Sequence, residues 1–379
     1  MRDTRILGAG KSISNDTRLT GLNNNDLIIG PSGSGKTTGY VIPNIMRSES
    51  SIITADTKNT LYRMLAPGLK EKGYSVYVIN FTSPKDSSSY NPLSYIPADG
   101  QKYDQRAVAS IAHTLIPDSL DKNEKFWVIS ARQVLECIIG FVMEALVPKD
   151  RNMVSVIEIL RLLCVQSTAG RASIPFLDEW ALLQPDSAAV GKYRLFKASM
   201  TADKMWASII QFVSSALDVF SAKEYSHMFR DRPYDFRIND LGRKKCAVFL
   251  NISDTDRSAD GLVNVFYTQV MQVLCREADK MPDGRLEQPV RIILDDFASN
   301  AYIPDFDRMI SVIRSREISV SVILQSLSQL EGMYTRSQSL TILNNCDHIV
   351  YLGGNDLATA EYVAARSFRT VENILCLDT

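Results

Sequence analysis

Short runs of apolar and often β-branched residues recur along the chain, with helical patterns between them. The runs lie at residues 26–29, 51–55, 74–79, 246–250, 290–294, 318–324 and 348–352. Most are nearly continuous in apolar residues and do not alternate with polar ones, which is typical of parallel strands covered on both faces. Strands that alternate with helices predict an α/β fold, a three-layer sandwich with one central sheet between two layers of helices.

The strand pattern stops between about residues 104 and 236. Helical periodicity fills this stretch, at residues 126–146, 154–163 and 202–220, with polar breaks around Pro148 and Pro185. We therefore expect an all-α insertion domain at residues 104–236. It would interrupt a discontinuous α/β domain formed by residues 1–103 and 237–379.

Composition supports a globular chain without an obvious nucleic-acid signature. The 379 residues suffice for two domains, and the fractions of 45% hydrophobic and 22% charged residues are ordinary for a packed core. The formal net charge is −1, so there is no global basic excess. Contact with DNA would depend on local basic loops, or on a ring that concentrates such loops in a channel.

Cysteine spacing and the apolar stretches exclude several other classes. The six cysteines are scattered without a C-x-x-C pair, and the three histidines are equally dispersed, so we predict neither a zinc site nor a disulfide framework. The polar N-terminus predicts no signal peptide. The most apolar long stretch, residues 134–147, is short and contains Glu136 and Glu144, which favours a buried helix over a membrane span.

Residues 30–37, GPSGSGKT, match the phosphate-binding loop G-x-x-x-x-G-K-[ST]. An apolar strand precedes them and a helical pattern follows, which favours this interpretation over a flexible Gly/Ser loop. Backbone N–H groups of such a loop cradle phosphates, while Lys36 reaches the β- and γ-phosphates and Thr37 ligates Mg²⁺. The predicted cofactors are therefore ATP and Mg²⁺. The expected nucleotide contacts are Gly30, Ser32, Gly33, Ser34, Gly35, Lys36, Thr37 and Thr38.

An acid pair, Asp295 and Asp296, directly follows the apolar run 290–294. Active sites of open α/β sheets lie at the carboxyl ends of their strands. Asp295 is expected to complete the Mg²⁺ site with Thr37, and Asp296 to act as general base on the attacking water. The alternative is a turn at the strand end with two solvated carboxylates.

Other polar residues flank the same strands, each with two interpretations. Gln325 follows the strand at 318–324 and could sense the γ-phosphate or orient water, or it could belong to a helix cap. Arg314 and Arg316 could complete a neighbouring subunit's site as an arginine finger, or compensate a helix dipole. Asp56 and Lys58 could serve the nucleotide, although a helix N-cap at Asp56 is at least as well supported.

An ordered set of motifs runs through nearly the whole chain. Its members are the phosphate-binding loop followed by residues 41–44 (VIPN), then 52–58 (IITADTK), 90–93 (YNPL), 126–127 (FW), 294–297 (LDDF), 303–306 (IPDF), 313–316 (IRSR), 324–330 (LQSLSQL) and 345–347 (NCD). The chain with this set resembles the type IV secretion coupling proteins, the TraG/TraD-type ATPases of conjugative DNA transfer. The loop alone is generic, and the ordered set is specific.

The resemblance implies a RecA-like motor domain with an all-α insertion, which agrees with the gap in the strand pattern. It implies a homo-hexameric ring at the cytoplasmic face of the bacterial membrane that hydrolyses ATP. The ring would pass a relaxase-bound single DNA strand, or a protein, to a membrane-spanning secretion channel. It also implies that Asp295 is the second-motif acid, Asp296 its catalytic partner and Gln325 the sensor.

Three departures from the family pattern affect these expectations. Such proteins usually begin with transmembrane helices, so we expect membrane association through a missing N-terminal anchor or through a partner. The family often has Glu where this chain has Asp296, and a shorter carboxylate predicts slower hydrolysis. Asp56-Thr57-Lys58 stands where the family favours Asp-Pro-Lys-Gly, which leaves the role of Lys58 open.

Two further functions fit parts of the sequence. A phosphotransferase would use the helical insertion as a lid, with clustered basic residues that clamp a second phosphorylated substrate. The basic residues of the insertion are dispersed, which disfavours this function. The second function is an ATP-binding recruitment scaffold with little ATP turnover. The shorter carboxylate of Asp296 is consistent with slow turnover, so this function remains an alternative to the motor.

Overall fold

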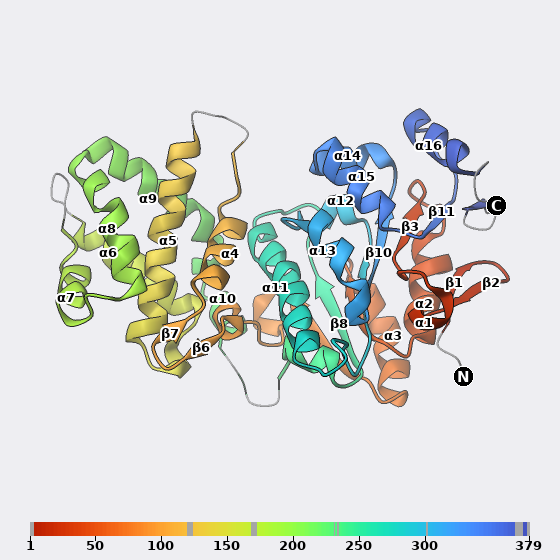
Figure 1. The fold of residues 1–379 in the computed structure, drawn as a ribbon, viewed down its shortest axis with the longest axis horizontal. Helices are drawn as coiled ribbons and strands as arrows, with labels where there is room; N and C mark the ends of the chain where they lie inside the picture. Colours follow the sequence, from red (N-terminus) through yellow and green to blue (C-terminus); the bar gives the residue numbers. More distant parts are fainter. Residues whose placement is uncertain are drawn as a thin grey trace. The chain divides into compact units, whose positions relative to one another are not determined.

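The computed structural model describes residues 4–119, 124–167, 173–230, 232, 235–300, 302–367 and 374–376. Contacts divide the chain into two compact units (Figure 1). The sheet unit comprises Met1–Thr82, Phe236–Asp260 and Val270–Thr379, and the helical unit comprises Ser83–Asp235 and Gly261–Gln269. The sequence placed residues 83–103 in the α/β domain, whereas their contacts group them with the helical unit.

The sheet unit is built on an eight-stranded parallel sheet with the order β12-β11-β3-β10-β9-β4-β8-β5. Its strands are β3 (Asp26–Ile29), β4 (Ser51–Ala55), β5 (Ser75–Asn80), β8 (Cys246–Asn251), β9 (Val290–Leu294), β10 (Ile318–Leu324), β11 (His348–Tyr351) and β12 (Ile374–Cys376). All seven apolar runs form strands, which confirms that part of the prediction. β12 and the N-terminal hairpin of β1 (Thr4–Gly8) and β2 (Lys11–Ser14) were not predicted.

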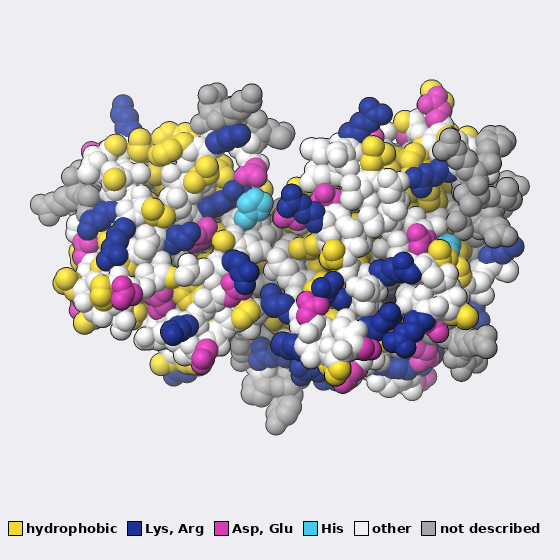
Figure 2. Space-filling model, viewed as in Figure 1, with side chains coloured by type: hydrophobic (Ala, Val, Ile, Leu, Met, Phe, Trp, Pro, Cys, Tyr) yellow, Lys and Arg dark blue, Asp and Glu magenta, His cyan; other side chains and the backbone are white. Residues whose placement is uncertain are grey.

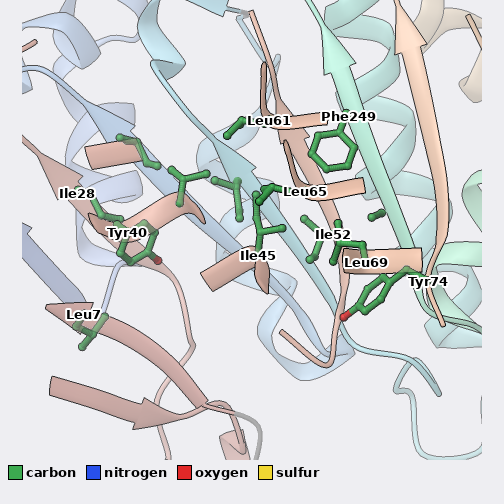
Figure 3. Packing of buried hydrophobic residues seen from close by; sticks show 14 of the residues in the cluster. Leu7, Ile28, Tyr40, Ile45, Ile52, Leu61, Leu65, Leu69, Tyr74 and Phe249 are labelled. Carbon is green, nitrogen blue, oxygen red and sulfur yellow. The ribbon is translucent and has the colours of Figure 1, made fainter. Parts of the chain in front are cut away.

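Helices connect the strands of the sheet unit and bury its apolar core. They are α1 (Thr17–Thr20), η1 (Lys36–Val41), α2 (Ile42–Arg47), α3 (Thr60–Glu71), η8 (Ile238–Gly242), α11 (Asp260–Asp279), α12 (Phe297–Asn300), α13 (Phe306–Val312), η9 (Arg314–Arg316), α14 (Leu327–Met333), α15 (Arg336–Asn344) and α16 (Leu357–Ser367). α11 begins and ends in the sheet unit, while residues 261–269 group with the helical unit. Figure 3 shows one cluster of this core, which includes Ile28 of β3, Ile52 of β4 and Leu65 of α3.

A buried ion network ties the N-terminal hairpin to the start of β3. Arg5 of β1 is 1% exposed, and its guanidinium pairs with the fully buried Asp26 carboxylate at 2.9 Å. Arg291 of β9 reaches the same carboxylate at 3.3 Å, and the Tyr40 hydroxyl also donates to it. Because Asp26 begins β3 and Tyr40 lies in η1, the network braces both sides of the loop that joins them.

The helical unit surrounds the long helix α5. Its elements are η2 (Pro84–Asp86), η3 (Pro92–Tyr95), β6 (Ala98–Asp99), β7 (Lys102–Tyr103), α4 (Gln105–Leu115), α5 (Lys125–Ala145), η5 (Pro148–Asp150), α6 (Met153–Gln166), α7 (Pro175–Leu183), α8 (Ala188–Lys197), η6 (Ala198–Thr201), α9 (Asp203–Leu217), η7 (Val219–Ser221) and α10 (Tyr225–Met228). α5 is long and apolar enough to cross a membrane, but 67% of its most apolar window is buried. It packs against α4, α6, α8 and α9, which accounts for its apolar character.

Charged side chains of both signs are mixed on the face of the molecule that Figure 2 draws. On the face drawn in Figure 2, Lys and Arg are interspersed with Asp and Glu over each unit. This agrees with the net charge of −1. On that face, contact with a polyanion would depend on local groups of basic side chains.

Candidate nucleotide-binding site

The glycine-rich loop joins the carboxyl end of β3 to η1. Gly35 has φ of +83°, a left-handed conformation that glycine adopts without strain. A Cβ on Gly30 would lie 2.4 Å from Ser34 Oγ and 2.9 Å from Leu352 Cβ, so the loop needs glycine there for close packing. The local fold therefore fixes a tight turn that leads straight into a helical turn, the geometry that presents backbone N–H groups to an anion.

Lys36 and Thr37 begin the helical turn. Lys36 is 7% exposed, and its Nζ donates to the carbonyl oxygens of Gly30 at 2.6 Å and Pro31 at 2.8 Å. These bonds hold the ammonium group inside the curve of the loop. A lysine in this place contributes positive charge to bound phosphates.

The acid pair follows β9, as the sequence predicted, and it contacts the loop. The Thr37 hydroxyl donates to Asp295 Oδ2 at 3.0 Å, and the Asp296 N–H donates to Asp295 Oδ1 at 3.1 Å. Burial, reinforced by the neighbouring Asp296 charge, raises the pKa of Asp295, although the Thr37 hydrogen bond opposes this shift. Thr37 and Asp295 thus form an all-oxygen pair that fits Mg²⁺.

The fit to Mg²⁺ depends on further ligands from outside the protein. Within the described parts of the chain, no group of three or more His, Cys, Asp or Glu side chains could hold a metal by itself. Mg²⁺ usually keeps several waters and binds through one or two carboxylates together with substrate phosphates. Asp295 and Thr37 would hold the ion, and a nucleotide bound in the loop would supply the phosphate oxygens.

Asp296 has an unusual backbone and an unsatisfied carboxylate. Its φ is +45°, in the left-handed region where Asp and Asn are the commonest residues after Gly. Its Oδ1 is buried without a hydrogen-bond partner among the described residues. A buried acceptor without a partner costs free energy, and strained residues of this kind cluster at functional sites. Both features suit a group that acts on a bound water.

A cleft of about 340 Å³ brings most of the predicted residues together. The residues that line it are Ser32, Gly33, Gly35, Lys36, Thr37, Thr38, Lys58, Asp296 and Gln325. They come from the carboxyl ends of β3, β4, β9 and β10. Gly30 and Ser34, which were also predicted to bind nucleotide, are not among the lining residues and instead pack within the loop.

Gln325 is exposed at the end of β10 and is among the residues that line the cleft. The segment 325–329, which the sequence also suggested as a helix cap, contains such a contact, since Gln329 Oε1 accepts a hydrogen bond from the Gln325 N–H at 2.9 Å. The segment therefore closes a turn before α14 and still leaves the Gln325 side chain at the cleft.

Arg314 and Arg316 lie in η9, just before β10 and so at the opposite edge of the sheet. Arg314 is exposed and donates to the Gly21 carbonyl oxygen. Arg316 pairs with Asp279 at 2.9 Å and also donates to Val312 O. Neither arginine lines the cleft of its own chain. Their action on a neighbouring subunit remains a prediction.

Two residues gain a structural context that the sequence alone did not provide. Asn44, part of the VIPN motif, lies in α2 and pairs with both backbone groups of Ile6, at 2.7 and 2.9 Å. It therefore fastens β1 to the helix that follows the loop. Lys58, whose role was left open, lines the cleft. The VIPN motif includes Asn44, but its partner Ile6 lies in β1, a strand that the sequence did not predict.

A glycine-rich loop at the carboxyl edge of a parallel sheet, faced by an acid pair, defines a P-loop NTPase. The chain belongs to the family described as Type IV secretory system Conjugative DNA transfer, whose sequence model matches residues 5–367. This confirms the expected membership in the type IV coupling proteins, a family of the membrane-associated secretion system.

Curated relatives support the same family. VirD4 of Agrobacterium fabrum (strain C58) is 23% identical over 350 residues, which cover 89% of this chain and 48% of VirD4. The conjugal transfer protein TraG of Escherichia coli is 24% identical over 363 residues, which cover 89% of this chain and 54% of TraG. The chain therefore spans about half the length of the curated relatives that it matches.

Solved structures show the same fold. The plasmid coupling protein TrwB in complex with ADP and Mg²⁺ has a TM-score of 0.65 at 16% identity, with 97% of this chain and 83% of that chain covered. VirB4 of Thermoanaerobacter pseudethanolicus has a TM-score of 0.51 at 15% identity, with 97% and 87% covered. The RecA-like α/β fold expected from the sequence is thus confirmed.

Proposed function

We propose that this chain is the ATP-hydrolysing motor part of a coupling protein. It delivers single-stranded DNA with its relaxase, or a protein, to a type IV secretion channel during conjugative transfer. The observation that carries the proposal is the single cleft that unites Lys36, Asp296 and Gln325, next to the Thr37–Asp295 pair. Binding alone would not require a general base and a strand-end amide at the same cleft.

Each side chain has one role in this proposal. Lys36 binds the β- and γ-phosphates, and Thr37 and Asp295 hold Mg²⁺, which offsets phosphate charge when it is bound. Asp296 takes the proton of the attacking water, and Gln325 orients that water or senses the γ-phosphate. The backbone N–H groups of the loop and of the first turn of η1 bind phosphate oxygens.

The partners follow from family membership and from the placement of the arginines. The family description, conjugative DNA transfer by a type IV secretory system, supports DNA and secretion-channel components as partners, and single-stranded DNA with its relaxase is the finer form that we propose. The homo-hexameric ring is part of this proposal, and Arg314, which is exposed at the sheet edge opposite the cleft, would act there on a neighbouring subunit. With a net charge of −1, DNA contact would depend on basic loops brought together by the ring. Membrane association would come from an N-terminal anchor outside this sequence or from a partner.

A recruitment scaffold with weak hydrolysis is the second candidate. Asp296 supports it, because Asp is one carbon shorter than Glu and its backbone is strained at φ of +45°. A base that is held too far from the water slows proton transfer without affecting nucleotide binding. The scaffold would therefore bind nucleotide at the same site as the motor and would differ from it only in the rate of ATP hydrolysis.

ATP turnover with and without single-stranded DNA tests the proposal. The purified chain, at concentrations that permit ring assembly, should hydrolyse ATP, and single-stranded DNA should raise the rate. Little or no turnover under either condition, with nucleotide still bound, would contradict the motor and support the scaffold.

A further inference from the structure

We propose that the Lys58 ammonium group binds the terminal phosphate of the nucleotide, so that this second lysine distinguishes a triphosphate from a diphosphate. The inference rests on the proposed nucleotide site and adds a residue to it. Lys58 lies after β4 and is among the residues that line the same cleft as Lys36 and Asp296.

The turn that carries Lys58 is firmly held. The Asp56 N–H donates to Leu250 O at 2.8 Å, and the Asn59 N–H donates to Asp56 O at 3.1 Å. The Asp56 carboxylate, 3% exposed, accepts from the N–H groups of three residues in the first turn of α3. These bonds fix the backbone at Lys58, so the turn itself does not have to be ordered when a ligand binds.

The backbone of Asn59 explains how this turn forms without glycine. Asn59 has φ of +52°, a left-handed conformation that glycine prefers and that asparagine tolerates better than most other residues. Asn59 follows Lys58 and directly precedes α3. Its left-handed backbone therefore lets the chain change direction and enter the helix at once. The chain thus keeps a turn that directs Lys58 to the cleft.

The strand order places Lys58 on the side of the cleft opposite the loop. β3, which carries the loop, is followed in the sheet by β10, β9 and β4. Lys36 approaches from the β3 side, whereas Lys58 comes from the β4 turn, next to the acid pair after β9. A phosphate chain that starts in the loop and extends toward the acid pair would present its last phosphate to Lys58.

The charges at the cleft favour an anion at this position. Lys58 is exposed, and no ion pair or hydrogen bond joins its side chain to any other described residue. Among the charged residues that line the cleft, Lys36 and Lys58 are basic and Asp296 is acidic. A diphosphate ends one phosphate earlier than a triphosphate, so it places no phosphate charge at this position. Lys58 should therefore contribute only to triphosphate binding.

Affinities for a non-hydrolysable ATP analogue and for ADP, measured with Mg²⁺, test this role. Lys58→Ala should weaken binding of the triphosphate about tenfold and leave ADP within about twofold, since one charge-assisted hydrogen bond is lost. Lys58→Arg keeps the charge and should recover part of the loss. Lys70→Ala is the matched control, because Lys70 is an exposed lysine in the adjacent helix α3 and does not line the cleft.

The outcomes separate this inference from the proposed function. Equal weakening of triphosphate and diphosphate by Lys58→Ala, or no change in either, overturns the role of Lys58 alone. If the unmodified chain binds neither nucleotide, the nucleotide site itself fails and the inference fails with it. Unchanged thermal unfolding of the variant would show that the loss is not a folding defect.

Discussion

The Thr37 hydroxyl donates a 3.0 Å hydrogen bond to Asp295 Oδ2, which joins the glycine-rich loop to the strand that carries the acid pair. The two residues are 258 positions apart in sequence. The contact places the two oxygen ligands expected for Mg²⁺ side by side at one edge of the sheet. It also places a largely buried carboxylate beside a second one, Asp296.

Asp295→Asn should stabilise the fold and impair Mg²⁺-dependent nucleotide binding. The pKa of Asp295 is raised by burial and by Asp296, so the ionised carboxylate lowers the free energy of unfolding. This destabilisation is present above the folded-state pKa and disappears as the pH falls to the ordinary Asp value. Chemical denaturation without Mg²⁺ should show the variant more stable than the parent at about pH 7 and no different at about pH 4. Equal stability at both pH values would contradict this account of Asp295.

Asp296→Asn should abolish turnover without loss of nucleotide affinity. Removal of a general base costs about 10²–10⁴-fold in rate. Asparagine tolerates the left-handed backbone at this position, so the fold should be kept. Steady-state ATP hydrolysis and nucleotide binding, measured in parallel, separate the two effects. A turnover rate in Asp296→Asn close to that of the parent chain would remove Asp296 from the mechanism.

Asp296→Glu is the complementary change. The longer carboxylate should reach the water more closely and raise turnover above that of the parent chain, even though glutamate is less well suited to φ of +45°. The strain should appear as a loss of about 1 kcal/mol in the free energy of unfolding. A rate at or below the parent rate would show that reach does not limit hydrolysis.

Arg314→Ala should lower turnover in the assembled state and leave nucleotide affinity unchanged. Arg314 is exposed and bonded only to the Gly21 carbonyl among the described residues, so it is free to reach a neighbouring subunit. Loss of an arginine finger costs about 10³-fold or more in rate. Arg316 is held by Asp279 and Val312 and makes a matched comparison.

Mixtures of inactive variants test whether the arginine acts between subunits. Arg314→Ala subunits mixed with Lys36→Ala subunits should regain part of the activity, because each variant can supply what the other lacks. The Arg316→Ala mixture serves as the comparison. If neither mixture regains activity, both arginines are excluded as the finger.

Asp26→Asn should destabilise the sheet unit by about 3–5 kcal/mol, since it leaves buried arginines without their carboxylate. Burial opposes ionisation of Asp26, yet Arg5, His348 and Arg291 together hold its pKa well below the usual range. The stability that Asp26 contributes is present above the ordinary Asp pKa and is lost as the pH falls through the lowered one. Urea unfolding near neutral pH measures the loss. A change below about 1 kcal/mol would show that the network does not hold the hairpin.

Sequence patterns predicted much of this architecture because buried parallel strands are continuous apolar runs. The phosphate-binding loop and the acid pair were predicted because their chemistry is carried by short sequence motifs at the ends of strands. The β1–β2 hairpin was missed, since Arg5 is polar in sequence and becomes buried only through Asp26 and His348. Lys58 could not be assigned because its place at the cleft depends on the left-handed Asn59 and on the neighbouring strands.

The affinity of Mg²⁺–ATP for the parent chain and for Lys36→Ala tests the central claim most directly. Lys36 is buried inside the loop, and its ammonium group is the main cation that the loop offers to phosphates. Lys36→Ala should weaken binding by about 100-fold or more, while Lys70→Ala leaves it unchanged. Equal affinity of Lys36→Ala and the parent chain would contradict a nucleotide site at this loop.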